Sequence, residues 1–364
     1  MLTTRRDFGR LGALGVLGVA AAALGRRAAP QASIPTPIRL SANENPYGPS
    51  PLALDAMRDA MRLAWRYPDE AADTLVDAIA RLHSVSSDQV IVGDGSSEIL
   101  KLAAAAFVDP ARKLVIADPT FEAIAAYARA AHAETVKVPL DTTYAHDLTK
   151  MSATNGSLIY ICNPNNPTGS ITPKQNVRSF LDAIPSSTMV LIDEAYHHYA
   201  ENSAYETAIP LVAIRPNLIV SRTFSKIYGM AGLRVGYAIA QADVIRKLQQ
   251  QAAWDSANGI GLAAARASLS DTKHVGDGKR RNSETKRDLV ASLSKLGYSV
   301  IPSDTNFIMI DTRRDVKPLI TTLRGRGVQV GRLFPAMPRH LRVTIGTPDQ
   351  MRQFFEAFRS VAAA

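Results

Sequence analysis

Short, unbroken runs of hydrophobic residues recur along the middle of the chain, separated by stretches with helical spacing. The runs lie at residues 90–92, 114–117, 158–162, 189–192, 218–220 and 235–239. Continuous apolar runs bounded by turn residues are typical of strands buried on both faces of a parallel sheet. Before the first run and after it, residues 71–82 and 99–107 place apolar side chains at the spacing of a helix that buries one face. The alternation predicts an α/β fold, a mostly parallel sheet with helices on both faces.

The same pattern divides the chain into regions. Residues 61–250 hold the alternating strands and helices and are expected to form a large domain. Residues 251–364 are expected to form a smaller α+β domain that ends in a helix at 348–361. Residues 34–60 are expected to contribute to this small domain and to cross the mouth of the active site.

Residues 1–33 have the charge pattern of an export signal followed by a linker. The segment Thr4-Arg5-Arg6-Asp7-Phe8-Gly9-Arg10 precedes an uncharged stretch of 15 residues, 11–25, rich in Ala, Gly and Leu. The paired arginines with Phe8 resemble the twin-arginine signal, which exports folded proteins. Since about 20 apolar residues are needed to span a bilayer, no stable membrane anchor is expected. We expect a periplasmic or exported protein, or a cytoplasmic one if the leader is not used.

Composition and charge narrow the function classes. The 364 residues are 46% hydrophobic, enough for a large core, and carry a formal charge of +9. The leader contributes five arginines and Asp7, or +4, which leaves +5 for residues 28 onward. With no recognisable nucleic-acid module, this mild charge does not predict nucleic-acid binding. Cys162 is the only cysteine, so no intramolecular disulfide can form, and no spaced His/Cys set predicts a metal site.

Glycine-rich and polar segments follow two of the apolar runs, at the edge where an α/β sheet binds its ligands. Gly93-Asp94-Gly95-Ser96-Ser97-Glu98 opens the helix at 99–107. Glycines there permit close approach of an anion, and the first helical amides attract it. Phe121 follows the run at 114–117 and could lie on a flat ring, although an aromatic residue is equally typical of a core.

Two further strand ends carry amides and a carboxylate. The turn Asn163-Pro164-Asn165-Asn166-Pro167-Thr168-Gly169 either points amides into a cleft or is simply a tight loop. Asp193-Glu194-Ala195-Tyr196 ends the run at 189–192. Its first carboxylate could pair with a protonated ring nitrogen, and its tyrosine could reach a phenolic oxygen. The alternative for Asp193 is the N-cap of a helix.

The most informative segment is residues 221–234. Lys226 lies between small hydroxyl residues just after an apolar run, and Arg234 follows eight residues later. Thr223, Ser225 and Arg234 could hold a phosphate beside the lysine amine, an arrangement that pyridoxal phosphate chemistry requires. Taken alone, the lysine also fits an ordinary surface loop.

These segments resemble the class I/II aminotransferases of pyridoxal phosphate fold type I, in the histidinol-phosphate aminotransferase-like branch. The resemblance also includes Asn43-Glu44-Asn45-Pro46-Tyr47-Gly48-Pro49, Arg66-Tyr67-Pro68 and Leu341-Arg342-Val343-Thr344-Ile345-Gly346. Seven segments follow the family's order from about residue 38 to the C-terminus. The resemblance implies the fold type I architecture and pyridoxal 5'-phosphate as cofactor.

The resemblance also implies a role for each matching residue. Lys226 would bond covalently to the cofactor and later move the substrate proton, and Asp193 would keep the ring nitrogen protonated. Tyr196 and Asn166 would bind the phenolic oxygen, and Phe121 would stack on the ring. The residues expected to bind the cofactor phosphate are Gly95, Ser96, Ser97, Thr223, Ser225 and Arg234.

Two residues connect the site to a second subunit and to the substrate. Tyr67 would reach the phosphate from the neighbouring subunit, which implies a homodimer with shared active sites. Arg342 would bind the substrate carboxylate with its two-pronged guanidinium. Independently of the family, residues 341–345 alternate apolar and polar, so Arg342 and Thr344 share one face of a short strand. A solvent-exposed strand arginine is the alternative.

One segment departs from the family pattern. Relatives that act on histidinol phosphate have an arginine after the valine of a Gly-x-x-Val segment. In Gly327-Val328-Gln329-Val330-Gly331-Arg332 a glycine stands there and the arginine follows one residue later. In a strand this offset turns the side chain to the opposite face, unless Gly331 lets Arg332 return. We expect the phosphate clamp to be missing or rebuilt, which argues against histidinol phosphate as substrate.

The predicted reaction moves an amino group from an L-amino acid or related amine to a 2-oxo acid, with ping-pong kinetics. A decarboxylase, lyase or cyclase that uses the same cofactor and fold is the nearest alternative. A NAD-dependent dehydrogenase fits less well, because Glu98 stands where a dinucleotide motif has its third glycine. A non-catalytic regulator is disfavoured because the chain lacks the added DNA-binding domain that such regulators carry.

Overall fold

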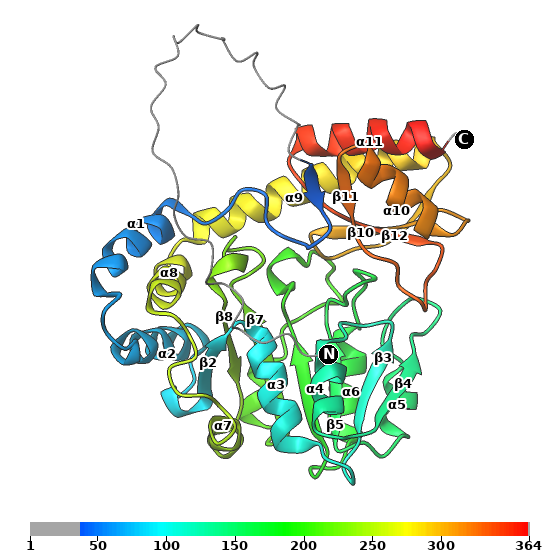
Figure 1. Cartoon of the computed structure of the whole chain (residues 1–364). Helices are drawn as coiled ribbons and strands as arrows, with labels where there is room; N and C mark the ends of the chain where they lie inside the picture. Colours follow the sequence, from blue (N-terminus) through cyan, green and yellow to red (C-terminus); the bar gives the residue numbers. More distant parts are fainter. Residues whose placement is uncertain (1–36, 363–364) are drawn as a thin grey trace, which may run out of the picture. The chain divides into compact units, whose positions relative to one another are not determined.

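A seven-stranded sheet forms the centre of the large domain (Figure 1). The computed structural model describes residues 37–362, so the predicted leader lies outside the described residues. The strand order is β2-β8-β7-β6-β5-β3-β4, and only β8 runs antiparallel to its neighbours. The strands are β2 (Val90–Asp94), β3 (Leu114–Asp118), β4 (Thr135–Pro139), β5 (Leu158–Cys162), β6 (Met189–Asp193), β7 (Leu218–Thr223) and β8 (Val235–Ile239). The predicted mostly parallel sheet is confirmed.

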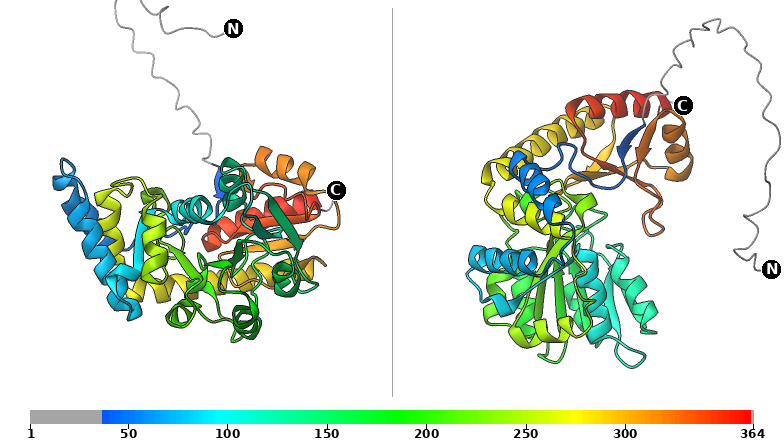
Figure 2. Two further views of the ribbon diagram at one scale, coloured as in Figure 1. Left: turned by 90° about the horizontal axis from the view of Figure 1, so that it is seen from below. Right: turned by 60° about the vertical axis from the view of Figure 1, so that its left-hand side comes forward.

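Alternate residues of the strands face two separate hydrophobic cores. In β6, Val190 and Ile192 belong to one core, and Met189 and Leu191 to the other. The first core includes residues of α2 (Asp69–His83), α5 (Leu148–Ser152), α6 (Lys174–Ala183) and α8 (Gly259–Leu269). The second includes residues of α3 (Ser96–Phe107), α4 (Ala123–Ala130) and α7 (Ala242–Gln249). Helices therefore cover both faces, as Figure 2 shows in its right-hand view.

Three antiparallel strands and three helices form the small domain. The strands are β9 (Ser299–Ile301), β10 (Phe307–Asp311) and β12 (His340–Thr344), in the order β12-β10-β9. The helices are α9 (Thr272–Lys295), α10 (Val316–Gly325) and α11 (Pro348–Ala362). Their core contains Ile308, Val343 and Phe354. Among the described residues, no helix has the length and hydropathy needed to cross a bilayer.

The start of the described chain belongs to this small domain. Strand β1 (Ile38–Leu40) pairs in parallel with β11 (Val328–Val330), and Leu40 packs in the small-domain core. Helix α1 (Pro51–Ala60) then packs against α8 of the large domain. The chain between these elements thus crosses from one domain to the other. The short 3-10 helices are η1 (Met61–Leu63), η2 (Ser87–Gln89), η3 (His197–Tyr199), η4 (Ile209–Ala213) and η5 (Ala231–Leu233).

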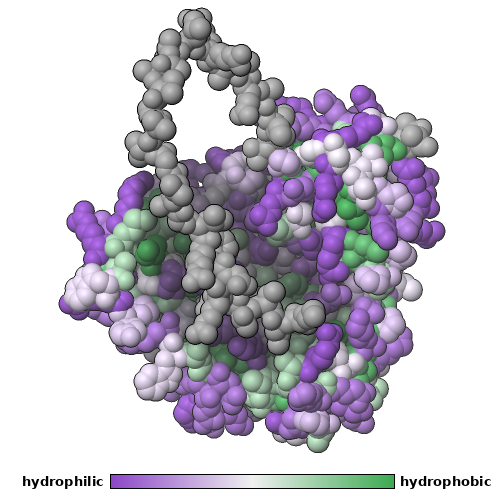
Figure 3. Space-filling model, in the orientation of Figure 1, coloured by the Kyte–Doolittle hydropathy of each residue, from purple (hydrophilic) through white to green (hydrophobic). Residues whose placement is uncertain are grey.

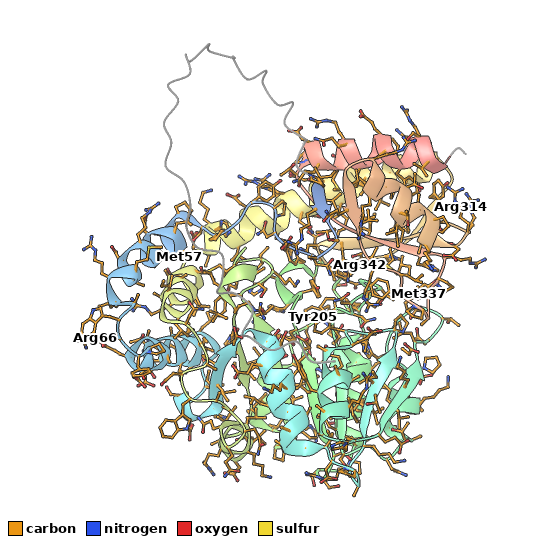
Figure 4. All side chains as sticks on the ribbon, in the orientation of Figure 1. Met57, Arg66, Tyr205, Arg314, Met337 and Arg342 are labelled. Carbon is orange, nitrogen blue, oxygen red and sulfur yellow. The ribbon has the colours of Figure 1, made fainter. Side chains whose placement is uncertain are left out.

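The sheet register brings the carboxyl ends of its central strands level. Cys162 at the end of β5 pairs with Asp193 at the end of β6, and Asp193 pairs with Ser221 of β7. Parallel strands all present their carboxyl ends at one edge, where α/β folds bind ligands. The small-domain strand β12 ends in Arg342, Val343 and Thr344. Figure 4 shows Arg342 on the side of the small domain that faces this edge.

Candidate active site

A cavity of about 350 Å³ lies at the carboxyl ends of the central strands. It is lined by the first turn of α3, by the segments after β3, β5, β6 and β7, and by the arm around residues 42–44. The small domain contributes the remaining wall. The predicted site residues that line the cavity are Ser96, Ser97, Phe121, Asn166, Asp193, Tyr196, Thr223, Ser225, Lys226, Arg234 and Arg342.

Lys226 extends from the segment after β7 into the cavity. Its Nζ lies 3.2 Å from the carbonyl oxygen of Asn43 and 3.4 Å from that of Ala42. Burial, followed by the positive charge of Arg342, lowers the pKa of Lys226 to about 8. An amine with this pKa is roughly one tenth neutral at pH 7 and can act as a nucleophile or a base.

Asp193 is a buried carboxylate at the tip of β6. Its Oδ2 accepts a hydrogen bond of 3.0 Å from the hydroxyl of Tyr160, and its Oδ1 accepts from Ser221 Oγ and the amide of Ala195, both at 3.2 Å. Burial raises the pKa of Asp193 to about 6, although these donors oppose the shift. The helix N-cap alternative does not apply, because the following residues form a turn and the short η3. A cationic partner in the cavity would hold this carboxylate ionised.

Tyr196 is held by a residue of the N-terminal arm. Its hydroxyl accepts a 3.0 Å hydrogen bond from Asn43 Nδ2. Asn43 has a φ of 56° and makes two hydrogen bonds with Thr344. Its Oδ1 accepts from Thr344 Oγ1 at 3.1 Å, and its backbone amide donates to the same hydroxyl at 3.0 Å. Burial raises the pKa of Tyr196 above its ordinary value. The phenol therefore stays protonated and can donate to an oxygen in the cavity.

Arg342 occupies the wall opposite Asp193. Its Nη1 donates to Asn166 Oδ1 at 2.6 Å and its Nη2 to the carbonyl of Ser41 at 2.7 Å. Its buried Nε has no partner among the described residues. Each Nη group carries a second hydrogen, and Arg342 lines the cavity, so this guanidinium can donate to an anionic ligand there. With its oxygen engaged by Arg342, Asn166 retains an amide group that can donate to a ligand.

Small residues and an arginine form an anion cradle at the other end of the cavity. Helix α3 begins at Ser96, where its first amides have no acceptor within the helix. Thr223 Oγ1 and Ser225 Oγ lie 2.9 Å apart, and Arg234 Nη1 lies 3.4 Å from Ser225 Oγ. Gly95 has φ 73°, and a Cβ there would overlap the Arg234 guanidinium. Hence only glycine at position 95 leaves this guanidinium its place beside the helix terminus.

Gly95 and Tyr67 are the two predicted site residues that do not line the cavity. Gly95 lies against Arg234, which does line it, whereas Tyr67 lies apart. Tyr67 lies in the loop after η1, and its exposed fraction is 81%. Its neighbour Arg66 is at one edge of the molecule, away from Arg342 (Figure 4). Tyr67 could act only on a different subunit, as its proposed role requires.

The position of Arg332 decides between two alternatives that the sequence left open. Its side chain is not turned away to the opposite face, because Arg332 lines the cavity. Strand β11 ends at Val330, so strand alternation no longer applies two residues later. Gly331 lies directly on Arg342, where an added Cβ would come within 2.8 Å of the Arg342 carbonyl oxygen. The cavity therefore contains a cationic side chain, one residue later in the sequence than in the family pattern.

Sequence reasoning gave no role to several residues of the cavity. Tyr160 and Ser221 bind the Asp193 carboxylate, and Asn43 binds Tyr196. A tyrosine within a buried strand is a usable signal, because its hydroxyl needs a partner. Asn43 and Phe334 gave no such signal, since their contacts depend on how distant segments meet. Cys162 also lines the cavity, and burial raises the pKa of its thiol, which disfavours a nucleophilic role.

These residues fit pyridoxal phosphate, the cofactor that the sequence resemblance implies. The cradle around Arg234 offers donors for a phosphate, and Asp193 offers a buried carboxylate for a ring nitrogen. Lys226 lies between them with an amine of lowered pKa, and Phe121 provides an aromatic face. The Arg342 guanidinium, which also lines the cavity, is left for a substrate anion. Among residues 37–362, no group of three or more His, Cys, Asp or Glu side chains is placed to hold a metal ion.

Comparison with known proteins gives consistent matches. Residues 35–358 match the family model described as aminotransferase class I and II. The chain is 39% identical over 332 residues to a histidinol-phosphate aminotransferase of Moorella thermoacetica, covering 90% of this chain and 86% of that protein. A relative of the same name from Symbiobacterium thermophilum is 38% identical, with 89% and 90% covered. The crystal structure of the Sinorhizobium meliloti histidinol-phosphate aminotransferase with pyridoxal-5'-phosphate superposes with a TM-score of 0.84 at 27% identity, covering 90% and 91%.

Proposed function

The chain belongs to the class I and II aminotransferases, and from this premise we propose that it transfers an amino group from an L-amino acid or related amine to a 2-oxo acid. Its cofactor is pyridoxal 5'-phosphate. The observation that supports the proposal most directly is the meeting of three groups in one cavity: the Lys226 amine, the Asp193 carboxylate and the Arg342 guanidinium. The reaction would alternate between two cofactor forms and follow ping-pong kinetics.

When bound, the cofactor supplies an electron sink for the charge left on the substrate α-carbon. Asp193 is positioned by Tyr160 and Ser221 to keep a proton on the cofactor's ring nitrogen. The Lys226 amine, with its pKa near 8, is suited to take a proton from the α-carbon and return it elsewhere. Asn43 fixes the hydroxyl of Tyr196, which would donate to the phenolic oxygen of the cofactor.

Arg342 supports substrates that carry a free α-carboxylate. Its guanidinium lines the cavity, and its two Nη groups are held in place by Asn166 and Ser41. A guanidinium held in this way binds a carboxylate with little loss of side-chain freedom. We therefore place L-amino acids first as donors. Histidinol phosphate is the second candidate, supported by the names of the relatives and by Arg332 in the cavity.

A homodimer with shared active sites is part of the proposal. The segment from α1 to Tyr67 exposes several large hydrophobic side chains, and Figure 3 shows hydrophobic residues over α1. Contiguous exposed apolar residues are typical of a protein interface. The exposed members are Leu52, Leu54, Met61, Leu63, Trp65 and Tyr67. Docking of this surface on a second copy would bring Tyr67 to the partner's cofactor phosphate.

We also propose that the twin-arginine-type leader exports the folded enzyme, which would act in the periplasm or outside the cell. The support is the residue pattern of positions 4–25 alone. A fusion of residues 1–33 to a reporter, with Arg5 and Arg6 changed to lysine as the control, tests it. Retention of the unchanged fusion in the cytoplasm would contradict export.

The central test replaces the lysine. Lys226→Ala is expected to abolish both amino transfer and the visible absorbance of the lysine-bound cofactor, because no other amine reaches the cavity in the described residues. Lys247→Ala, at an exposed position on α7, is the matched control and should keep both. Activity is measured by screening amino acids and histidinol phosphate against 2-oxoglutarate and other oxo acids. Amino transfer that survives in Lys226→Ala would refute the assignment.

A further inference from the structure

An ion pair joins the two domains at the edge of the cavity. Arg332 follows β11 in the small domain, and its Nη2 lies 2.6 Å from Oε2 of Glu122. Glu122 precedes α4 in the large domain. The two side chains are 54% and 44% exposed. Because Arg332 also lines the cavity, the pair is accessible to a ligand.

The pair is not explained by a structural role of either residue. Glu122 stands at the N-terminus of α4, yet its side chain accepts no hydrogen bond from the helix amides. Arg332 makes one further hydrogen bond, from Nη1 to the neighbouring carbonyl of Leu333 at 3.1 Å. A half-exposed ion pair contributes little to the stability of a fold. Its position in the substrate cavity is therefore the more informative property.

Arg332 and Arg342, the expected binding site of the substrate α-carboxylate, both lie against the ring of Phe334. The guanidinium carbon of Arg332 lies 4.4 Å from the centre of the Phe334 ring, and that of Arg342 lies 5.2 Å from the same centre. If Arg342 binds the α-carboxylate, the far end of the substrate side chain lies near Phe334 and Arg332. This end of the cavity thus combines an apolar ring with a cation whose charge is balanced by the protein itself.

We propose that Arg332 selects substrates by exchange of carboxylates, with Glu122 as its built-in counter-ion. When the substrate side chain is uncharged, Glu122 keeps Arg332 neutralised and Phe334 supplies an apolar contact. When the side chain ends in a carboxylate, as in dicarboxylic amino and oxo acids, that group takes the place of Glu122 on Arg332. The inference rests on the proposed aminotransferase function and names its substrate classes.

The exchange is physically reasonable because both carboxylates are equivalent partners for a guanidinium. A bidentate carboxylate from the substrate replaces the pair at similar geometry, and Glu122 is exposed enough to be hydrated when released. An uncharged side chain, by contrast, would face an unpaired cation if Glu122 were absent. Glu122 therefore permits two substrate classes in one cavity, as an enzyme with alternating donor and acceptor requires.

The kinetic test measures the half-reaction of the holoenzyme with L-glutamate and with L-leucine. Arg332→Ala is expected to lower kcat/KM for glutamate on the order of 10- to 100-fold, with leucine changed by no more than about threefold. Glu122→Gln is expected to raise kcat/KM for glutamate and lower that for leucine, since the competitor of the substrate carboxylate is removed and Arg332 is left unpaired. Arg178→Ala, which breaks a partly exposed ion pair with Glu206 away from the cavity, is the matched control and should change neither substrate.

A binding measurement separates selection from catalysis. Calorimetric titration of the holoenzyme with glutarate and with pentanoate compares a dicarboxylate and a monocarboxylate of equal length, neither of which reacts. The wild-type protein is expected to bind glutarate more tightly than pentanoate. Arg332→Ala should abolish the difference and Glu122→Gln should enlarge it.

Equal losses for both substrates in Arg332→Ala would overturn the proposal, because the pair would then only hold the domains together. An unchanged glutamate-to-leucine ratio in Glu122→Gln would also overturn it, and this variant keeps the test decisive if Arg332→Ala does not fold. If the wild-type holoenzyme converts neither these two amino acids nor any other amino donor of the screen described above, the proposed function itself fails. Conversion of both with no preference in either variant would reject carboxylate exchange alone.

Discussion

Asn43 contacts more groups of the active site than any residue for which the sequence predicts a chemical role. Its amide and side chain bind Thr344 of the small domain, its Nδ2 binds Tyr196 of the large domain, and its carbonyl receives Lys226. Its φ of 56° lies in the left-handed region, which asparagine tolerates better than most residues. The backbone and side chain of one residue thus contact groups from three distant segments.

Replacing this residue tests its positioning role. Asn43→Ala is expected to lower kcat/KM about tenfold, because Tyr196 loses its donor and Thr344 loses its acceptor on the Asn43 side chain, while the backbone bond from residue 43 to Thr344 remains. The visible absorbance of the bound cofactor should shift in its pH dependence while the protein remains folded by circular dichroism. Asn176→Ala, exposed on α6, is the control. Unchanged kinetics and an unchanged pH profile in Asn43→Ala would show that the contacts are incidental.

The difference between Lys226 and Asn43 shows what the sequence could reveal at this scale. Lys226, Asp193 and Arg342 carry charges whose chemistry is specific, and two of them follow apolar strands directly, so their types and places predict a site. Asn43 acts through partners up to 301 residues away. Its importance depends on the tertiary fold, which local patterns do not encode.

Buried titratable side chains gather where α2, β7 and η3 meet. Arg222 of β7 forms an ion pair of 2.8 Å with Glu194, and both side chains are almost fully buried. His83 near the end of α2 bonds Tyr237, and His197 of η3 bonds Tyr205. Burial, with Arg222 as the next cause, lowers the pKa of His83 to about 4 and that of His197 to about 3.

The lowered pKa values of these histidines predict that the folded protein loses stability in acid. In the unfolded chain their pKa is near 6.5, so below this pH the unfolded state binds protons that the folded state excludes. The free energy of unfolding should therefore fall as the pH is lowered from about 6.5 toward 4, with His83 contributing on the order of 2 kcal/mol. Urea unfolding at about pH 7 and about pH 5 measures this. His83→Gln should reduce the difference, and an equal slope in that variant would contradict the assignment.

At the scale of elements, the strands that the sequence predicts are those buried on both faces of the sheet. The runs that became β5, β6 and β7 are buried on both faces and therefore read as continuous apolar stretches. Strand β4 has only Val138 buried, because it lies at the sheet edge, and its mixed sequence gave no signal. The sequence left the face of Arg332 open, because this depends on the packing of Gly331 on Arg342 at the end of β11, a contact that local patterns do not encode.

At the scale of the whole molecule, the proposed function implies that a single chain does not hold a complete active site. Trp65 and Tyr67 are 75% and 81% exposed on the same segment as α1 and η1. Side chains of this size are seldom so exposed without a partner. The sequence resemblance implied the partner, whereas the fold of one chain can only show that Tyr67 lies apart from its own cavity.

Mixed dimers test whether the sites are shared. Lys226→Ala is expected to be inactive and Tyr67→Ala to have weakened cofactor binding. After subunits of the two variants are unfolded and refolded together, about half of the dimers should be mixed, and one site in each should contain both native residues. Activity should therefore rise to about a quarter of the wild-type value at limiting cofactor. Activity equal to the average of the two separate variants would exclude sharing of Tyr67.

The contact between Asn43 and Thr344 has a consequence for the order in which the enzyme is made. The two residues are 301 positions apart, and a backbone amide of one lies 3.0 Å from the hydroxyl of the other. A ribosome must therefore release the chain at least as far as Thr344 before the catalytic pocket can close. The vitamin-derived coenzyme can be captured in its final geometry only after that residue has been made, so an earlier interruption of synthesis yields a product without a complete pocket.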